Sequence, residues 1–513
     1  MSSKTITPRI SLQPIDRLAL AVMLMLSVLI GILLLSGDQT APRVRDFSWQ
    51  NQQVGAEDTA FSLTFSRPMN HASVEANLQI KPSLPGKTSW AGRRMAYTPL
   101  TPAPYGIKYE VKLQGAKDQI SSKDENKGKL LEPFVGNFST RDRIFAYVGV
   151  EKEEHGRLIL YNLTAGKKML LTPPDLVVMD FKPYPNGDRL LFSASDRKTQ
   201  EQGLLTQQLY TVTTGLSFNS DQDKKEAQPL GKITPILDSK DYQNLKFDLS
   251  ADGKIIVVQR ANRRNPAEFG LWVLQPDAPW RPLNNQPGGD FLIAPDSASV
   301  AVAQGQGVAI LPLPLTKDKE AQPTTKEAKP LDFLPKFGMV LSFAEDGTAA
   351  AMMKFNTDYT RSLFLVTNQG IQKEILRTSG SVLACEFAPK KDNLYCLLTQ
   401  LVKGEEFKEE PFFAAIDIKA ANNDKASTVK PLVALANQRD IQMSLSPDGL
   451  ALLFDQLVTQ PPNATDNLRT NEGQAIATGM LWLLPLVEAT PETNQSKIPP
   501  EQLIAGFHPR WLP

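Results

Sequence analysis

The sequence predicts an all-β protein that follows a single N-terminal transmembrane helix. The 39 prolines and 31 glycines are spread between short apolar runs, and few segments keep a helical period for several turns. A strand–turn–strand pattern recurs after residue 143, and one uncharged apolar segment lies near the start of the chain. With 513 residues, the chain is long enough for two to four domains.

The uncharged segment LALAVMLMLSVLIGILLL predicts a transmembrane helix over residues 18–36. Its length corresponds to about 27 Å of helix, close to the thickness of a bilayer core. Because Lys4, Arg9 and Arg17 precede it, the positive-inside rule leaves residues 1–17 as a cytoplasmic tail and carries the rest across the membrane. A cleaved signal peptide is the alternative, although the following LSGDQTAP lacks a small-x-small cleavage site.

The charge of the chain argues against nucleic-acid binding. Lysine and arginine total 56, and aspartate and glutamate total 55. A nearly neutral chain produces no global field that would attract a polyanion, so we expect no nucleic-acid partner.

Residues 41–140 alternate between apolar and polar side chains, which is typical of strands. About 100 residues with some seven short strands, interrupted by Pro and Gly turns, fit an antiparallel β-sandwich. The apolar faces of two of these strands are formed by Phe61, Leu63 and Phe65 and by Tyr109, Val111 and Leu113.

This segment also resembles a known family. LTFSRPMN, SVEANLQIKP, MAYTPLTPAPYGIKYEVKL and FSTRD are similar to the strand motifs of bacterial Ig-like domains of surface and cell-envelope proteins. The resemblance implies a spacer or adhesion module and no catalytic role. His71 and Asp118 are the polar residues that stand out, but we expect His71 to be a turn residue, since no second metal ligand lies at a useful spacing.

The recurring pattern after residue 143 predicts a β-propeller. Each copy has a strand, a turn built on Pro, Asp or Asn and Gly, and a second apolar strand, followed by a third strand and a weaker fourth one. Asp-Gly and Asn-Gly supply the positive φ that tight hairpins need, and four strands per repeat is the pattern of a propeller blade. The copies begin near residues 178, 244, 290, 339, 382 and 441.

The end of the chain predicts how the propeller closes. The first unit, RIFAYVGVEKEEHGRLILYNLTAGKKMLLTP, has no first strand, and FHPRWLP at the C-terminus occupies the place that LSPDG has in the last full copy. We therefore expect the C-terminal strand to complete the first blade, which leaves no long unpaired edge. This predicts a seven-bladed propeller over residues 143–513, and six or eight blades are the alternatives because the fourth copy is degenerate.

The SPDG turns and the final HPRWLP are similar to those of the TolB-like and WD40-like propellers. Some relatives in that group carry an α/β-hydrolase domain after the propeller, and we expect none here. These motifs concern hairpin geometry and packing, so they do not indicate an activity.

No catalytic constellation is visible in the sequence. His71, His155 and His508 lie in separate contexts, and the G-x-S-x-G, H-E-x-x-H and G-x-G-x-x-G motifs do not occur. The turn residues Asp252, Asp346 and Asp448 are explained by backbone geometry, so they are not expected to be catalytic. The sequence favours a protein that is not an enzyme and has no catalytic, cofactor-binding or metal-binding residues.

Cys385 and Cys396 are the only cysteines, and they lie symmetrically about the PKKD turn of one hairpin. An exported protein permits a disulfide between them. Opposed strand residues have Cβ atoms about 4.5 to 5.5 Å apart, slightly more than a relaxed disulfide prefers. Two small buried thiols are the alternative.

The loops that lead from an outer strand to the next inner strand surround one mouth of a propeller, and we expect a partner-binding rim there. The side chains predicted for this rim mix aromatic and charged groups, as interfaces do. They are Asp175, Asp241, Tyr242, Phe337, Arg439 and Asp440.

These elements together predict a non-catalytic protein of the bacterial cell envelope. The N-terminal helix would anchor it in the inner membrane, with the bulk of the chain in the periplasm, and an Ig-like spacer would hold the propeller off the membrane as a binding platform for a protein partner. The alternative is that the propeller channel binds or hydrolyses a small ligand or a glycan.

Overall fold

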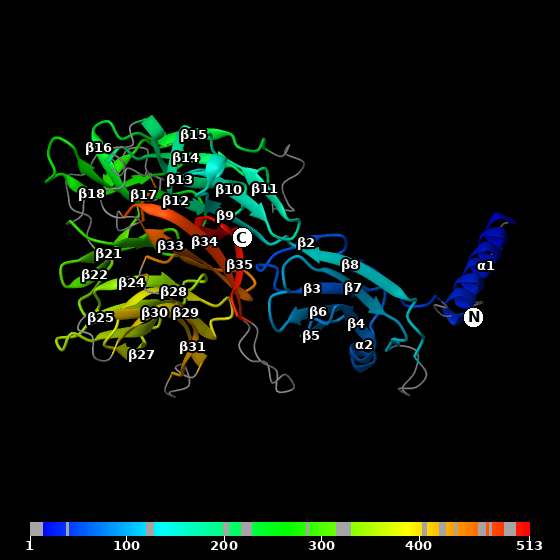
Figure 1. Cartoon of the computed structure of the whole chain (residues 1–513). Coiled ribbons are helices and arrows are strands. Elements are labelled where there is room, and N and C mark those ends of the chain that lie inside the picture. The colour runs from blue at the N-terminus through cyan, green and yellow to red at the C-terminus, as the bar shows by residue number, and fades with distance from the viewer. Residues whose placement is uncertain are drawn as a thin grey trace, which may run out of the picture.

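The structure is a computed structural model in which two groups of β-sheets lie side by side (Figure 1). The chain is all-β apart from a few helices, as the sequence predicts. The structure describes residues 14–36, 40–119, 128–198, 205–216, 228–283, 287–313, 330–402, 408–419, 427–435, 438, 440–459, 468–470, 474–486 and 499–513.

The apolar N-terminal segment forms helix α1 (Pro14–Ser36). Most of its described apolar side chains are exposed. Within the described residues, no helix combines the length and the apolar character needed to cross a membrane. The transmembrane helix expected over residues 18–36 is therefore not found.

The first domain consists of two four-stranded sheets that share one apolar core. The alternation in the sequence explains the packing, because Leu63 on one sheet and Val111 on the other are both fully buried. Unlike the expected antiparallel arrangement, β2 runs parallel to β8. One sheet contains β1 (Val44–Phe47), β3 (Phe61–Phe65), β6 (Arg94–Pro99) and β5 (Gly86–Ala91) in this order, and the other contains β2 (Gln53–Val54), β8 (Phe134–Thr140), β7 (Lys108–Leu113) and β4 (Leu78–Lys81).

His71 begins the short helix α2 (His71–Asn77), and the expected turn is not formed. The side chain of Asn70 accepts a hydrogen bond from the Ser73 N–H at 2.9 Å, which satisfies one of the free donors at the start of the helix. The His71 ring stacks on Trp90 with 4.1 Å between the ring centroids. Asp118 is buried. His71 and Asp118 therefore both make contacts within the fold of this domain.

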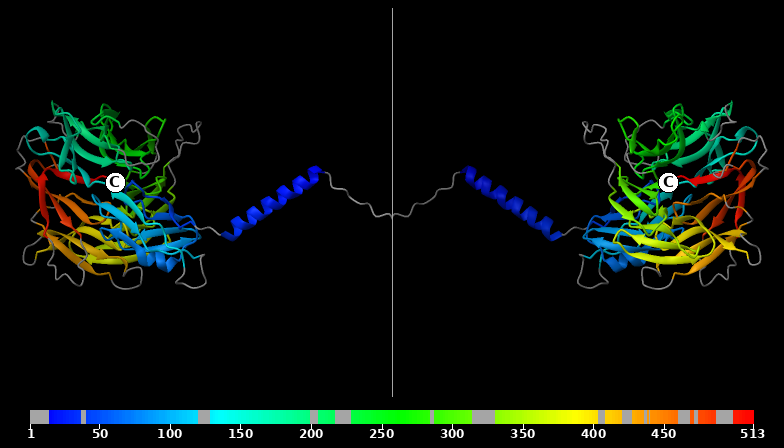
Figure 2. Two further views of the ribbon diagram at one scale, coloured as in Figure 1. Left: turned by 90° about the vertical axis from the view of Figure 1, so that its right-hand side faces the viewer. Right: turned by 90° about the vertical axis from the view of Figure 1, so that its left-hand side faces the viewer.

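The rest of the chain forms four-stranded antiparallel sheets, and seven of them lie within the described residues. In Figure 2, these sheets follow one another around a ring in chain order. The first three are β9 (Ile144–Val148), β10 (Leu158–Asn162) and β11 (Lys167–Leu170) with β36 (Phe507–Trp511); β12 (Leu176–Pro183), β13 (Arg189–Asp196), β14 (Gln208–Thr213) and β15 (Ile233–Leu237); and β16 (Tyr242–Leu249), β17 (Ile256–Asn262), β18 (Phe269–Leu274) and β19 (Arg281–Leu283).

The next two sheets are β20 (Phe291–Ile293), β21 (Ser299–Gln304), β22 (Gly307–Pro312) and β23 (Asp332–Leu334), and β24 (Met339–Phe343), β25 (Ala349–Phe355), β26 (Arg361–Thr367) and β27 (Gln372–Thr378). The last two are β28 (Val382–Phe387), β29 (Asn393–Leu401), β30 (Glu409–Asp417) and β31 (Val429–Ala434), and β32 (Met443–Leu445), β33 (Ala451–Thr459), β34 (Ile476–Pro485) and β35 (Glu501–Ala505). A short 3-10 helix, η1 (Lys152–Glu154), follows β9.

In the six sheets after the first, a tight turn joins the first two strands, and each turn has one residue with a positive φ. Gly187, Gly253, Gly347 and Gly449 fill this position where the sequence has the expected glycine. Ser297 (φ 56°) and Lys391 (φ 54°) adopt the same conformation in the two copies that lack it. The hairpin is thus kept even where its sequence signature is lost.

The C-terminal strand completes the first sheet, as the sequence predicts. Strand β36 pairs with β9 in an antiparallel register, with Phe507 opposite Val148 and Trp511 opposite Phe145. The Trp511 and Phe145 rings pack edge to face, with centroids 5.6 Å apart. A strand from the far end of the chain therefore closes the ring.

A fully buried carboxyl group fixes the closing strand. Both oxygens of Asp455 on β33 accept backbone hydrogen bonds, one from the Gln442 N–H at 2.8 Å and the other from the His508 N–H at 2.7 Å. Burial raises the pKa of Asp455 to about 7, and the two N–H donors only partly oppose this shift. Asp455 therefore ties β32 and β36 to its own strand.

The side chains of β36 also reach the neighbouring sheet. His508 Nε2 lies 3.1 Å from Asp180 Oδ1 on β12, and Arg510 lies beside the same carboxylate. Burial acts to raise the pKa of Asp180, but His508, Arg510 and Lys182 outweigh it and hold this pKa below its usual value. Both ionic and apolar contacts therefore hold the closing strand β36 in the ring.

Cys385 and Cys396 face each other on β28 and β29 and are joined by a disulfide. Their Cα atoms lie 4.1 Å apart. Both side chains are buried in the core of this sheet.

Candidate functional site

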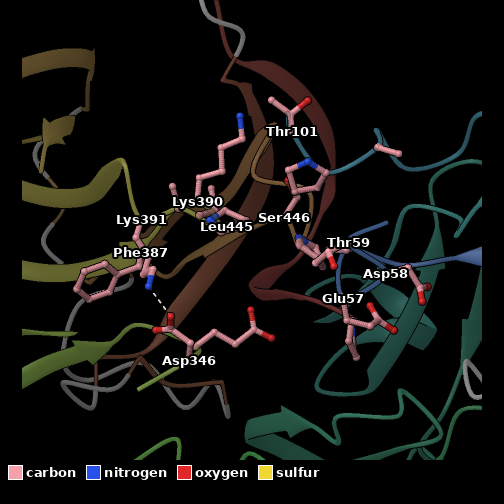
Figure 3. A pocket seen from close by; sticks show the side chains of 18 of the residues that line it. Glu57, Asp58, Thr59, Thr101, Asp346, Phe387, Lys390, Lys391, Leu445 and Ser446 are labelled. Carbon is pink, nitrogen blue, oxygen red and sulfur yellow. Dashed lines mark hydrogen bonds and ion pairs between the residues drawn. The ribbon is translucent and has the colours of Figure 1, made fainter. Parts of the chain in front are cut away.

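A cleft of about 790 Å³ lies between the first domain and the propeller. Figure 3 shows its two walls, with Glu57, Asp58 and Thr59 on one side and Phe387, Lys390 and Lys391 on the other. The lining comprises residues 56–59, 98–103 and 105 of the first domain, and residues 342, 343, 345, 346, 386–391, 445–447 and 513 of the propeller.

A buried hydrogen bond joins the two domains beside this cleft. The backbone N–H of Tyr105 donates to Asp448 Oδ2 at 3.0 Å, and both residues are buried. Asp448 also holds its own SPDG turn, because its other oxygen accepts from the Ser446 hydroxyl and the Leu450 N–H. Burial raises the pKa of Tyr105 to about 12, and its hydroxyl oxygen accepts the Ala56 N–H at 2.9 Å. One turn aspartate therefore both shapes a hairpin and docks the first domain.

The propeller contributes an apolar wall to the cleft. Phe343, Phe387 and Leu445 occupy equivalent positions in adjacent sheets, each four residues before the positive-φ residue of its turn. Leu100, with 51% of its surface exposed, lies in the opposite wall. The regular repeat of the inner hairpins thus places apolar side chains next to one another at this end of the ring.

Glu386 lies beside this apolar wall and is the most perturbed acid of the cleft. Its Oε2 accepts the Leu445 N–H at 2.7 Å. Burial raises the pKa of Glu386 to about 7, against smaller opposing effects of that N–H and of the positive charge of Arg510. Ser342 occupies the equivalent position on the adjacent strand β24, and its buried Oγ has no hydrogen-bond partner among the described residues. Glu386 lines the cleft and is only half-buried, so its carboxylate is available to a ligand, whereas the Ser342 Oγ is shielded from solvent.

The other acids of the cleft are mostly engaged. Asp346 forms an ion pair with Lys391, visible in Figure 3. Burial would raise the pKa of Asp346, but its bonds to Lys391 and Thr348 lower it to about 2. Glu57 pairs with Arg141, which is buried behind it.

The predicted partner-binding rim lies at the other mouth of the propeller. Its residues precede the inner strands, whereas the cleft is formed where those strands end. Asp175 and Asp241 are exposed, and the Tyr242 ring packs against Trp272 with centroids 5.1 Å apart. The structure does not gather the predicted set into one site.

The other three members of the predicted rim are Phe337, Asp440 and Arg439. Phe337 is 1% exposed and packs edge to face on Phe364, so its assignment to a partner-facing surface was wrong. An aromatic residue after a loop can complete the core as readily as it can face solvent. Asp440 is half-buried, and Arg439 lies outside the described residues.

The cleft could not be predicted from the sequence, because the segments that line it are far apart in the chain. The turn aspartates Asp346 and Asp448 were assigned to backbone geometry, which is correct but incomplete, since each also bonds beyond its own turn. The useful signal was the equivalent placement of Glu386 and Ser342 before their turns. No pattern indicated which mouth the first domain would cover.

The remaining titratable groups form no evident catalytic or metal centre. The three histidines are on different elements, where His71 stacks on Trp90, His155 contacts Arg197, and His508 contacts Asp180. In the part of the chain that the structure describes, no three His, Cys, Asp or Glu side chains are grouped so that they could hold a metal ion.

Comparisons with known proteins give similarity at the level of structure. No family model and no curated protein matches the chain. One similar solved structure is TolB from Acinetobacter baumannii, with 12% identity and a TM-score of 0.37 over 75% of this chain and 85% of that one. Another is oligogalacturonate lyase from Vibrio parahaemolyticus, with 9% identity and a TM-score of 0.40 over 61% of this chain and 88% of that one. At these identities the likeness concerns the fold alone.

Proposed function

We propose that this protein is a cell-envelope binding platform whose protein partner enters the cleft between the first domain and the propeller. The observation that carries the proposal is that both domains line the cleft and that a buried bond between Tyr105 and Asp448 holds them together there. A preformed cleft reduces the entropy that a partner must lose on binding. Its apolar wall and charged edges have the composition of a protein interface.

The proposal includes a finer architecture. Each four-stranded sheet would be one blade of a seven-bladed propeller, and the first domain would be an Ig-like spacer. The segment over residues 18–36 would anchor the chain in a bacterial inner membrane, with the two β domains in the periplasm. This anchor rests on the uncharged segment and on the preceding Lys4, Arg9 and Arg17.

The proposed role is not catalytic. Asp346 is engaged by Lys391 and Thr348, and Asp58 accepts the Gly55 N–H in its own loop. These acids are thereby held in structural bonds, and Glu386 is left as the acid with the most unusual environment. A single carboxyl group beside an apolar wall suits recognition of a partner.

Site-specific photo-crosslinking in cells tests the proposal and identifies the mouth that is used. The exposed residues Lys390, in the cleft, and Asp241, at the opposite mouth, would each be replaced by p-benzoylphenylalanine in the full-length chain. We expect a specific protein adduct from position 390 and none from position 241.

The other outcomes are equally informative. An adduct from position 241 alone would move the partner to the predicted rim and exclude the cleft. If neither position gives a specific adduct under several growth conditions, the platform role is refuted.

A small ligand or a glycan is the second candidate occupant. It is favoured by the size of the cleft, which falls within the usual range for small-molecule sites, and by the raised pKa of Glu386. Thermal-shift screening of envelope sugars against the full-length protein separates the two proposals. A sugar whose stabilisation is lost in Glu386→Gln would favour this second role.

A further inference from the structure

The lining of the cleft is more acidic than basic. Five carboxylates line it, from Glu57, Asp58, Glu345, Asp346 and Glu386, against the ammonium groups of Lys390 and Lys391. Lys391 and Asp346 are paired with each other, and Glu57 is paired with Arg141. Asp58, Glu345 and Glu386 then remain against Lys390. A cationic group therefore finds more favourable partners in the cleft than an anionic one does.

The polar part of the cleft lining lies beside its apolar wall, an arrangement that fits a long side chain with a charged end. Glu386 and Ser342 lie on neighbouring inner strands, and each lies one residue before a member of the apolar wall, Phe387 or Phe343. Lysine and arginine place an aliphatic stem along an apolar surface and leave the charge at the tip. Such a stem would cover the wall while its tip reaches the Glu386 carboxylate.

The existing contacts of Glu386 leave it short of positive charge. Its carboxylate accepts a hydrogen bond from one backbone N–H, on Leu445. Arg510 is the cation that acts on it across the propeller, but Arg510 is shared with Asp180, at 3.9 Å. A guanidinium or ammonium group in the cleft would supply the positive charge that a carboxylate removed from water needs.

We infer that the cleft receives an arginine or lysine side chain from an extended segment of the protein partner, with its charged end at Glu386. This inference rests on the proposed function, and it names the feature of the partner that the cleft would recognise. Anionic groups, including phosphorylated side chains, are disfavoured as the inserted group.

Binding of a cation would be coupled to loss of a proton. Burial raises the pKa of Glu386 to about 7, so the ionised form that attracts a cation becomes dominant only as the pH rises above this value. The charged groups around it are Arg510 at the channel and Glu345, Asp346, Lys390 and Lys391 in the cleft. Affinity for the cationic segment should therefore increase from about pH 6 to 8.

Peptide pools with one fixed central position test the inference. The pools would be seven-residue peptides with random flanks and a central arginine, lysine, norleucine or glutamate, displayed on a surface and probed with labelled full-length protein in detergent. We expect retention on the arginine and lysine pools to exceed that on the norleucine pool by about tenfold or more. The glutamate pool should be the weakest.

Two variants make the result specific. Glu386→Gln keeps an oxygen that can accept the Leu445 N–H but removes the charge, and it should abolish the preference for the cationic pools and its pH dependence. Glu345→Gln removes an exposed carboxylate of the same cleft and should change retention by less than about twofold. A cooperative melting transition in each variant would show that both are folded.

The inference and the proposed function fail in different ways. Equal retention on all pools, or a cation preference that survives in Glu386→Gln, would overturn the inference. If position 390 still captures a partner in that case, the platform role stands and the recognition chemistry is different. If capture also fails, both are overturned.

Discussion

At the scale of single residues, the protein keeps two carboxyl groups whose pKa values burial raises to about 7, the half-buried Glu386 and the fully buried Asp455. In the unfolded chain these groups would titrate near 4.5 and 3.8. Between these values and about pH 7, the folded state binds more protons than the unfolded state. The free energy of unfolding must therefore fall as the pH rises through this window.

This effect can be measured by urea unfolding between about pH 5 and 8. Each group contributes a slope of at most about 1.4 kcal/mol per pH unit, and the curve should level off above the raised pKa values. Glu386→Gln should flatten the slope, whereas Glu345→Gln should leave it unchanged. Stability that rises with pH over this window would contradict the assignment.

Asp180 and Asp346 act in the opposite direction but in a lower pH range. Their pKa values are depressed in the folded state, so the stability they contribute is present above about pH 4 and is lost as the pH falls further. They do not obscure the window in which Glu386 and Asp455 titrate.

At the scale of elements, the sequence predicted the inner hairpins well because their turns have strong local requirements. The Asp-Gly and Asn-Gly turns fix both the register and the direction of the next strand. Ser297 and Lys391 show that the copies with weaker signatures fold in the same way. Helix α2 was missed, because a helix of this length has too few turns to show a period, and its start depends on the cap formed by Asn70.

Strand β36 allows a direct test of the closure. Deletion of residues 506–513 would remove the buried side chains of Phe507, Trp511 and Leu512 and would leave β9 unpaired. Loss of a buried aromatic side chain costs about 3–5 kcal/mol, so the melting temperature of the propeller should fall by at least about 10 °C. Leu170→Ala, on the outer strand β11, is the control and should have a small effect. A melting curve that is the same after the deletion would refute the closure.

The disulfide makes a prediction for the hairpin of β28 and β29. Without a reductant, Cys385 and Cys396 should resist alkylation even in the unfolded protein, and mass spectrometry should find their peptides linked. Because the two residues are 11 apart in sequence, reduction should lower the free energy of unfolding by about 2–3 kcal/mol. Alkylation of both residues in the unreduced, denatured protein would show that they are free thiols.

At the scale of the whole molecule, the sequence predicted the order of its parts but not their placement. Periodicity and turns are local and can be read within each segment. The cleft depends on Tyr105 meeting Asp448, two residues that are distant in sequence, and Asp448 has a complete local explanation in its own turn. The cleft could therefore not be expected from the sequence.

The joint between the domains can be tested by comparing two equivalent turn aspartates. Asp448→Ala removes a turn contact and the bond to Tyr105, whereas Asp252→Ala removes only the matching contacts to Ser250 and Lys254. Loss of one buried hydrogen bond costs about 1 kcal/mol, so trypsin should cut at Arg143 about fivefold faster in Asp448→Ala alone. Equal cleavage in both variants would show that the joint does not depend on this bond.

The closure of the ring by β36 also sets an order of events during synthesis. Strands β9, β10 and β11 emerge early, yet their sheet stays incomplete until β36 has been made and, in the proposed location, exported. Until then β9 presents a free edge that can pair with another chain. The protein therefore depends on rapid completion or on a chaperone that covers this edge, and a ribosome or translocon that stalls late would release a chain prone to aggregate.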